Sequence, residues 1–192
     1  IVMSSILEIP TSIKFEFDER KATEAACLLL QRANNRLPYL KLIKMLYLAD
    51  RMSLKQYGEP ITGDRYVAMK YGPVLSNVFD LIKEDIKGEF WSTKIKKDKF
   101  DSVLIADFSP KALCEADVEI LTKCSDFCQQ YDRWDLVDIV HKLPEWQDPG
   151  ETSTPISVES ILKVFNKSDE EIEEIRQEAS DKLYFHQMLT GA

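Results

Sequence analysis

The feature that most constrains the fold is a nearly continuous apolar segment at residues 39–57, YLKLIKMLYLADRMSLKQY. At about 100° per residue, its basic side chains fall in one narrow stripe and its apolar side chains cover most of the remaining circumference. The basic stripe consists of Lys41, Lys44, Arg51 and Lys55. A helix that is apolar on so many sides must be surrounded by other elements. The segment predicts a compact domain around a central buried helix, with the charges of the basic stripe reaching water at its rim. The alternative interpretation of the stripe is a groove for an acidic partner or a phosphate.

Capping residues and stop signals predict further helices on both sides of this segment. Asp18 is a typical N-cap for a helix over residues 19–35, and Gly58 followed by Pro60 ends the central helix. Four more helices are expected in the second half of the chain, at residues 110–131, 133–143, 157–165 and 169–189. Ser109 would cap the first of these, with Pro110 at its first position. The last helix is very acidic and begins with a capping box.

Three short stretches have the character of strands. Residues 65–70 end at Gly72-Pro73, which predicts an abrupt stop of the strand and a helix that opens at Pro73. Residues 89–108 hold two strand-like runs around a turn at residues 96–99, which predicts a protruding hairpin with an exposed Trp91. Residues 13–17 predict a short edge strand. The expected fold class is therefore mainly α, of the α+β type, with a small hairpin and short antiparallel strands.

The length of 192 residues fits one domain. We expect an irregular N-terminal segment at residues 1–17, a main domain at residues 18–150, and a helical extension at residues 151–192 packed on the same domain. Met3 is the expected natural start. The sequence has no run of about 20 apolar residues and no secretory signal, which predicts a cytoplasmic protein without a membrane span.

Charge and motifs argue against several classes of function. The net charge of −8 disfavours nucleic acid as a partner, since neutralising phosphates needs a basic surface. Four cysteines without a Cys-x-x-Cys pair, and only two histidines, predict no metal site. No nucleophile motif or phosphate loop occurs, so we expect no cofactor, no catalytic residue and no enzyme. His141 with Asp135 or Asp138 is the one acid/base arrangement worth naming, and a hydrogen-bonded structural histidine packed under Trp146 is the favoured interpretation.

Several short motifs follow one another in a specific order. Residues 41–49 read K-L-x-K-x-L-Y-x-A, Gly58 and Pro60 follow, and residues 68–74 read A-x-x-Y-G-P-V. Downstream lies VHKLPEW at residues 140–146. Together these resemble the Panacea domain of the SocA-like bacterial antitoxins, strongly over residues 18–85 and less so to residue 146. The residues that match its structural turns are Gly58, Pro60, Ala68, Gly72 and Pro73.

The resemblance implies an antitoxin, encoded in a bacterial, phage or prophage genome, that binds a co-encoded toxin and holds it inactive. The alternative known in the family is a proteolytic adaptor that delivers the toxin to a Clp-type protease. Met69 replaces the aromatic residue common in the family, and the acidic segment from Pro155 onward has no counterpart there. The expected partner is the cognate toxin, with a Clp-type protease in the alternative, and a homo-oligomer is left open.

Candidate partner-binding residues are the large aromatic and basic side chains near these motifs, because such residues dominate binding energy at interfaces. They are Lys41, Lys44, Tyr47, Arg51, Tyr71, Trp91, His141 and Trp146. The other interpretation is that they belong to the core, with Tyr47 and Tyr71 bracing the central helix. Trp91 and its neighbour Phe90 lie on the expected hairpin, and Trp91 is the one expected to be exposed.

Overall fold

The computed structural model describes residues 12–191, so the expected start at Met3 and most of the N-terminal segment lie outside the described residues. The fold is mainly helical with two small antiparallel sheets, as predicted. Its helices are α1 (Glu19–Arg32), α2 (Tyr39–Tyr57), α3 (Ser76–Lys83), α4 (Trp91–Lys94), α5 (Glu115–Cys128), α6 (Arg133–His141), α7 (Val158–Val164) and α8 (Asp169–Thr190). Its strands are β1 (Arg36–Pro38), β2 (Tyr66–Met69), β3 (Gly72–Leu75), β4 (Ile95–Asp98), β5 (Asp101–Leu104) and β6 (Thr154–Ile156).

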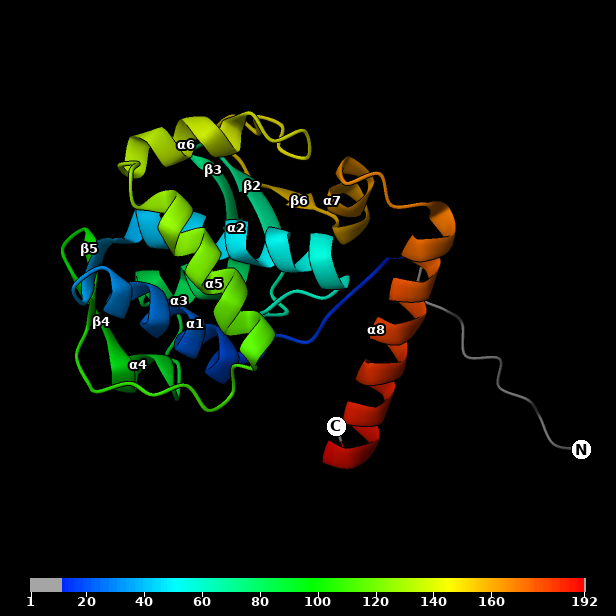
Figure 1. The fold of residues 1–192 in the computed structure, drawn as a ribbon, viewed down its shortest axis with the longest axis horizontal. Coiled ribbons are helices and arrows are strands. Elements are labelled where there is room, and N and C mark those ends of the chain that lie inside the picture. Colours follow the sequence, from blue (N-terminus) through cyan, green and yellow to red (C-terminus); the bar gives the residue numbers. More distant parts are fainter. Residues whose placement is uncertain (1–11, 192) are drawn as a thin grey trace, which may run out of the picture.

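Helix α2 runs through the middle of the domain, as its sequence predicted (Figure 1). Helices α1 and α5 pack against one side of it, and β3, α6 and α7 surround the rest. Leu42, Ile43 and Leu54 on this helix are completely buried. The helix ends at Gly58, whose φ of 72° is the left-handed conformation that glycine adopts without strain.

One sheet has the strand order β3-β2-β6, and the other has the order β1-β5-β4. Strands β2 and β3 form a tight hairpin in which Met69 lies opposite Gly72. Strand β6 arrives from far along the chain and pairs with the other edge of β2, with Ile156 opposite Tyr66. The β2–β3 hairpin is therefore clamped between α2 and α6 on one side and β6 on the other.

The structure corrects the interpretation of the Gly72-Pro73 corner. These residues open strand β3, and the next helix begins only at Ser76. Gly72 has a φ of 93°, which lets the chain reverse direction after Tyr71. Pro73 fits an extended strand because its fixed φ is compatible with that geometry.

Four other sequence predictions are wrong. Residues 91–94 form helix α4 instead of a strand, and the β4–β5 turn lies at Lys99-Phe100, after the predicted position. Residues 13–17 form no strand. The helix expected at Pro110 begins at Glu115, because the Glu24 carboxylate binds the backbone N–H groups of residues 111–113 and holds them in a loop.

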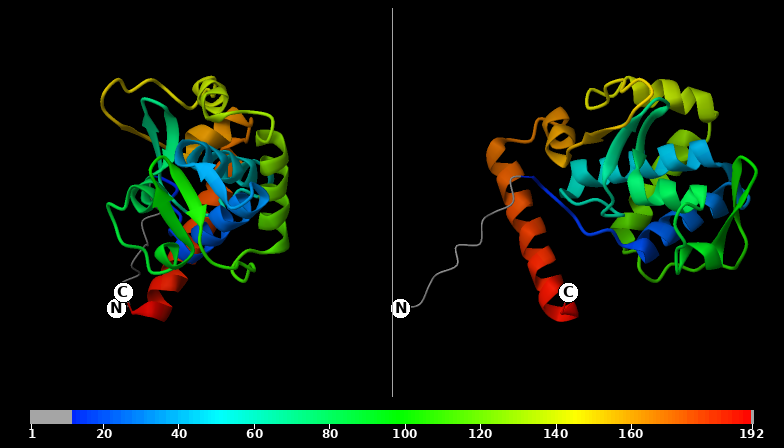
Figure 2. Two further views of the ribbon diagram at one scale, coloured as in Figure 1. Left: turned by 90° about the vertical axis from the view of Figure 1, so that its left-hand side faces the viewer. Right: turned by 180° about the vertical axis from the view of Figure 1, so that it is seen from behind.

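Helix α8 lies on the outside of the molecule, beside the ends of α2 and α7 (Figures 1 and 2). It starts with the predicted capping box of Ser168 and Glu171. Its inward face buries Ile172 and Ala179, and Ile175 packs on the backbone of Gly58. Its C-terminal turns extend past the body of the domain (Figure 2).

Candidate docking face

The motif residues of the sequence converge where α2, the β2–β3 hairpin and α6 meet. Lys44 lies at the centre of this junction and is completely buried, which corrects the prediction that its charge reaches water. Its Nζ donates a hydrogen bond to the carbonyl of Pro73 (2.8 Å). Desolvation lowers the pKa of Lys44 to about 7. Lys44 thus fastens the hairpin to the central helix.

A second buried contact fastens the loop after α6 to the same helix. Glu145, whose side chain is completely buried, accepts hydrogen bonds from the Tyr47 hydroxyl (3.0 Å) and from Arg51 Nε (2.6 Å). Desolvation and the Glu145 carboxylate raise the pKa of Tyr47 well above its usual range. The Arg51 guanidinium also lies over the ring of Phe165, 4.5 Å from its centroid. Tyr47 and Arg51 therefore hold the loop in place and are committed to intramolecular partners.

The VHKLPEW segment closes the junction from the outside. His141 stacks on Trp146 with ring centroids 4.1 Å apart, which is the packing that the sequence predicted. Trp146 Nε1 donates to the backbone carbonyl of Met69 (3.2 Å). Val140 lies so close to Gly72 that a Cβ at residue 72 would be 2.5 Å from its Cγ2. The expected hydrogen bond is absent at Nε2 of His141, which is buried without a partner in the described structure. These contacts fix the hairpin turn against α6.

Two buried carboxylates, which the sequence analysis missed, hold the loop between α2 and β2. Asp50 accepts hydrogen bonds from the backbone N–H groups of Ile61 and Thr62 and from the Thr62 hydroxyl. Burial nevertheless raises the pKa of Asp50 to about 7. Asp64 accepts from the N–H groups of Asn77 and Val78 at the start of α3. The sequence did contain a signal for Asp50, because it is an acidic residue within the apolar segment at residues 39–57.

Beside this buried network, four aromatic side chains from separate elements meet at the surface, one half-buried and three exposed. We call it the aromatic face; it consists of Tyr39, Tyr71, Phe100 and Trp134. Tyr71, Trp134 and Phe100 are 50%, 49% and 70% exposed, which is unusual for large apolar side chains. The Tyr71 and Trp134 rings meet edge to face at 5.8 Å. Together with Arg133, the four rings line a shallow cavity of about 200 Å³.

The predicted partner-binding residues lie in three environments: the exposed aromatic face, the buried core and half-buried positions between them. Tyr71 is exposed on the aromatic face, while Lys44 and Tyr47 are buried in the core. Lys41 is half-buried, and its Nζ donates to the carbonyl of Tyr131. Trp91 was expected to be exposed on a hairpin, but it is 5% exposed in helix α4 because it packs into the core beside Gly88.

A third group of predicted residues, Arg51, His141 and Trp146, is half-buried around Glu145 and the hairpin. The sequence analysis missed Phe100 and Trp134, which lie in a turn and on a short helix where no periodic pattern marks them. Phe90, which was also named, is exposed beside Arg20.

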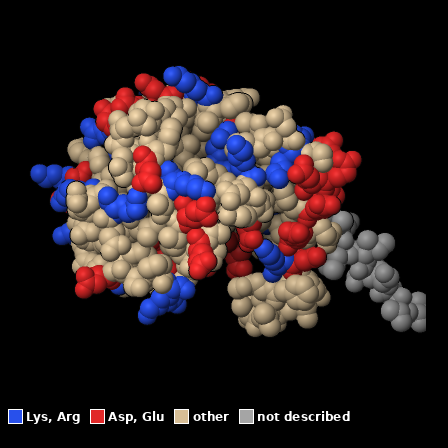
Figure 3. Space-filling view, in the orientation of Figure 1, with Lys and Arg blue, Asp and Glu red and all other residues tan. Residues whose placement is uncertain are grey.

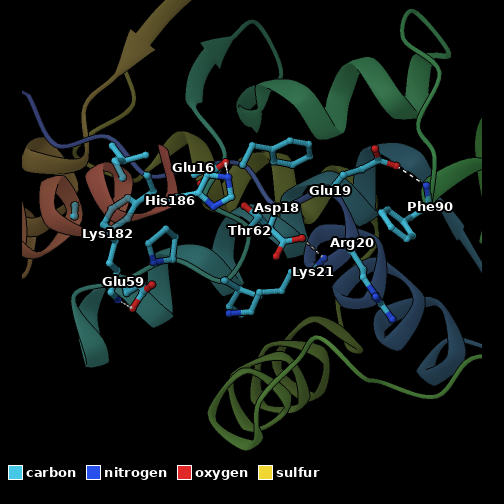
Figure 4. Close-up of a pocket in the computed structure, with 17 residues that line it drawn as sticks. Glu16, Asp18, Glu19, Arg20, Lys21, Glu59, Thr62, Phe90, Lys182 and His186 are labelled. Carbon is cyan, nitrogen blue, oxygen red and sulfur yellow. Dashed lines mark hydrogen bonds and ion pairs between the residues drawn. The ribbon is translucent and has the colours of Figure 1, made fainter. Parts of the chain in front are cut away.

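A larger cavity of about 530 Å³ separates α8 from the start of α1 (Figure 4). Two polar contacts span it: Lys182 with Glu59 (2.6 Å) and His186 with Glu16 (3.0 Å).

Across residues 12–191, no group of three or more His, Cys, Asp or Glu side chains is placed to hold a metal ion. No helix in the described part of the chain combines the length and the apolar character that a membrane span requires.

Comparison with known proteins gives one match. No curated protein and no solved structure is significantly similar to this chain. The family model described as "Antitoxin SocA-like, Panacea domain" matches residues 42–147, more than half of the chain. This range includes most of α2, the β2–β3 hairpin, α6 and Glu145, and so the buried contacts of Lys44, Tyr47 and Trp146 described above. The chain therefore belongs to the SocA-like antitoxin family and carries its Panacea domain.

Proposed function

We propose that this protein is an antitoxin of a bacterial toxin–antitoxin system that neutralises a co-encoded toxin by direct contact. Membership of the SocA-like antitoxin family is the observation that carries this proposal. The protein acts in the cytoplasm as a binding module without a reaction of its own. Its toxin is encoded beside it, in a bacterial, phage or prophage genome.

The aromatic face is the proposed contact surface. Aromatic side chains and arginine supply most of the binding energy at protein interfaces, because they bury a large area at a small loss of conformational entropy. Tyr71 and Trp134 form the centre of the face, and Arg133 lies at its edge. A specific interface buries on the order of 1,600 Å² in total, so the toxin would cover this face and its polar surroundings.

The buried network supports this role by making the surface rigid. Tyr71 lies in the turn of a hairpin that Lys44, Trp146 and Val140 hold from three sides. A side chain that is already held in place loses little entropy on binding, which favours affinity. In this proposal the motif residues act as a support for the docking surface.

Co-expression with the neighbouring gene tests the proposal. We expect the wild-type protein to restore growth and to co-purify with the toxin. The double variant Tyr71→Ala/Trp134→Ala should fold normally and lower the affinity about 30-fold or more, since the loss of two central anchors removes at least about 2 kcal/mol. Tyr57→Ala is the matched control, because Tyr57 is 47% exposed at the other end of α2. Rescue without a complex would contradict direct neutralisation.

A proteolytic adaptor that delivers the toxin to a Clp-type protease is the alternative mechanism within the same family. The two mechanisms differ in a strain that lacks the protease. Direct neutralisation predicts that rescue persists there and that the toxin level stays constant. Delivery to the protease predicts that rescue disappears and that the toxin accumulates.

A further inference from the structure

The outward side of α8 carries an uncompensated acidic surface. The helix contains seven acidic and two basic residues, and both basic residues are engaged within the protein. Arg176 pairs with Glu159 and Glu173, and Lys182 pairs with Glu59. Glu174, Glu178 and Asp181 have no ion-pair partner in the described structure and are exposed. Their charges therefore face solvent.

The same line of the helix becomes apolar toward its C-terminal end. Residues 174, 178, 181, 185 and 188 follow one another at intervals of three or four, so they lie on one face. The last two are Phe185 and Met188, which are 62% and 64% exposed, and Leu189 beside them is 88% exposed. We call Glu174, Glu178 and Asp181 the acidic stripe, and Phe185, Met188 and Leu189 the apolar end.

This outward face has no role in holding α8 to the domain. The helix is attached through Ile172, Ile175 and Ala179 on its inward face and through the polar contacts across the cavity. Figure 3 shows the acidic residues along the upper part of the helix and an uncharged surface at its lower end, away from the body. A helix of 22 residues is about 33 Å long, so this face is long enough for a substantial interface.

We propose that the outward face of α8 is a second docking surface, and that its occupant is a basic surface of the toxin with an apolar pocket beside it. This inference rests on the proposed function. Charge complementarity identifies the partner: the acidic stripe attracts basic side chains and repels nucleic acid and anionic lipid. A second copy of this chain would bring like charges together. The apolar end supplies the anchors and the acidic stripe sets orientation and association rate.

Matched charge variants test this assignment. The dissociation constant is measured between the purified full chain and the purified product of the neighbouring gene at low and high salt. Glu174→Gln/Glu178→Gln/Asp181→Asn removes three charges from the acidic stripe. Asp85→Asn/Glu89→Gln/Asp107→Asn removes three exposed charges elsewhere and is the control. We expect the stripe variant to bind about tenfold or more weakly at low salt, with a smaller difference at high salt, and the control to bind as the wild type does.

The apolar end is tested separately with Phe185→Ser/Met188→Ser/Leu189→Ser. All three side chains are exposed, so the variant should keep the wild-type melting temperature while binding at least tenfold more weakly at both salt concentrations. Wild-type affinity in both α8 variants would overturn this inference and leave the proposed function intact. Absence of binding by the wild-type protein would overturn both. Loss of a dimer in the apolar-end variant, with toxin binding unchanged, would assign the face to a second copy and also overturn the inference.

Discussion

Replacing Lys44 with methionine should change how the stability of the protein depends on pH. The ammonium group of Lys44 lies in the core, where desolvation lowers its pKa from 10.5 to about 7. Between these two values the folded protein holds Lys44 neutral, while the unfolded chain keeps it protonated. The unfolded state then binds more protons, so the free energy of unfolding rises with pH. Below about pH 7 both states are protonated and this contribution to the slope vanishes.

The magnitude follows from the linkage relation. One bound proton changes the free energy of unfolding by about 1.4 kcal/mol per pH unit at 25 °C. From pH 7.5 to 9.5, Lys44 should therefore add about 2 to 3 kcal/mol to the stability of the wild type. Other groups also titrate in this range, and burial raises the pKa of Cys27 to about 12. Their contributions cancel when the wild type is compared with Lys44→Met, because the variant retains them.

Urea unfolding at several pH values measures this effect. The difference in unfolding free energy, wild type minus Lys44→Met, should increase steadily from pH 7.5 to 9.5. Lys55→Met is the matched control, since Lys55 is exposed on the same helix. Parallel pH profiles for the wild type and Lys44→Met would refute the reasoning. That result would mean that Lys44 keeps its proton in the folded state.

Two further predictions concern the contacts around the hairpin, both measured by urea unfolding. Glu145→Ala should destabilise the protein by about 3–5 kcal/mol, because it leaves the Arg51 charge and the Tyr47 hydroxyl without their buried partner. A cost below about 1 kcal/mol would show that water replaces the carboxylate. Gly72→Ala should cost at least about 2 kcal/mol through its positive φ and the collision with Val140. Gly150→Ala also has a positive φ but open space around it, so it should cost less.

The parts of the fold that local signals determine could be predicted from the sequence. The period of α2 and the caps at Asp18, Ser157 and Ser168 depend only on neighbouring residues, and these helices are where they were expected. The Gly72-Pro73 corner could not be interpreted in this way. The same two residues suit a helix start or a hairpin. The hairpin is held by Lys44, 29 positions before Pro73, and by Val140, far along the chain, and neither contact can be read from the residues around the corner.

The candidate site was harder to predict because its contacts join distant parts of the chain. Tyr47 meets a carboxylate 98 positions away, and Lys44 meets a carbonyl 29 positions away. Helical periodicity placed Lys44 on the same stripe as Lys41, Arg51 and Lys55, but it contains no information about the hairpin that covers Lys44. The aromatic face has the same origin, since Phe100 and Trp134 become neighbours of Tyr71 only when three elements come together.

A buried amine in the core of a docking protein has a physical consequence for recognition. An apolar side chain at position 44 could pack against the hairpin in several registers, because apolar contacts are not directional. Lys44 is satisfied by a carbonyl, and the one it reaches here is that of Pro73. A shifted hairpin would leave the amine unpaired in the core, at a cost of several kcal/mol. Lys44 therefore disfavours displaced hairpins more strongly than it stabilises the native one, and this keeps Tyr71 in a single position for its partner.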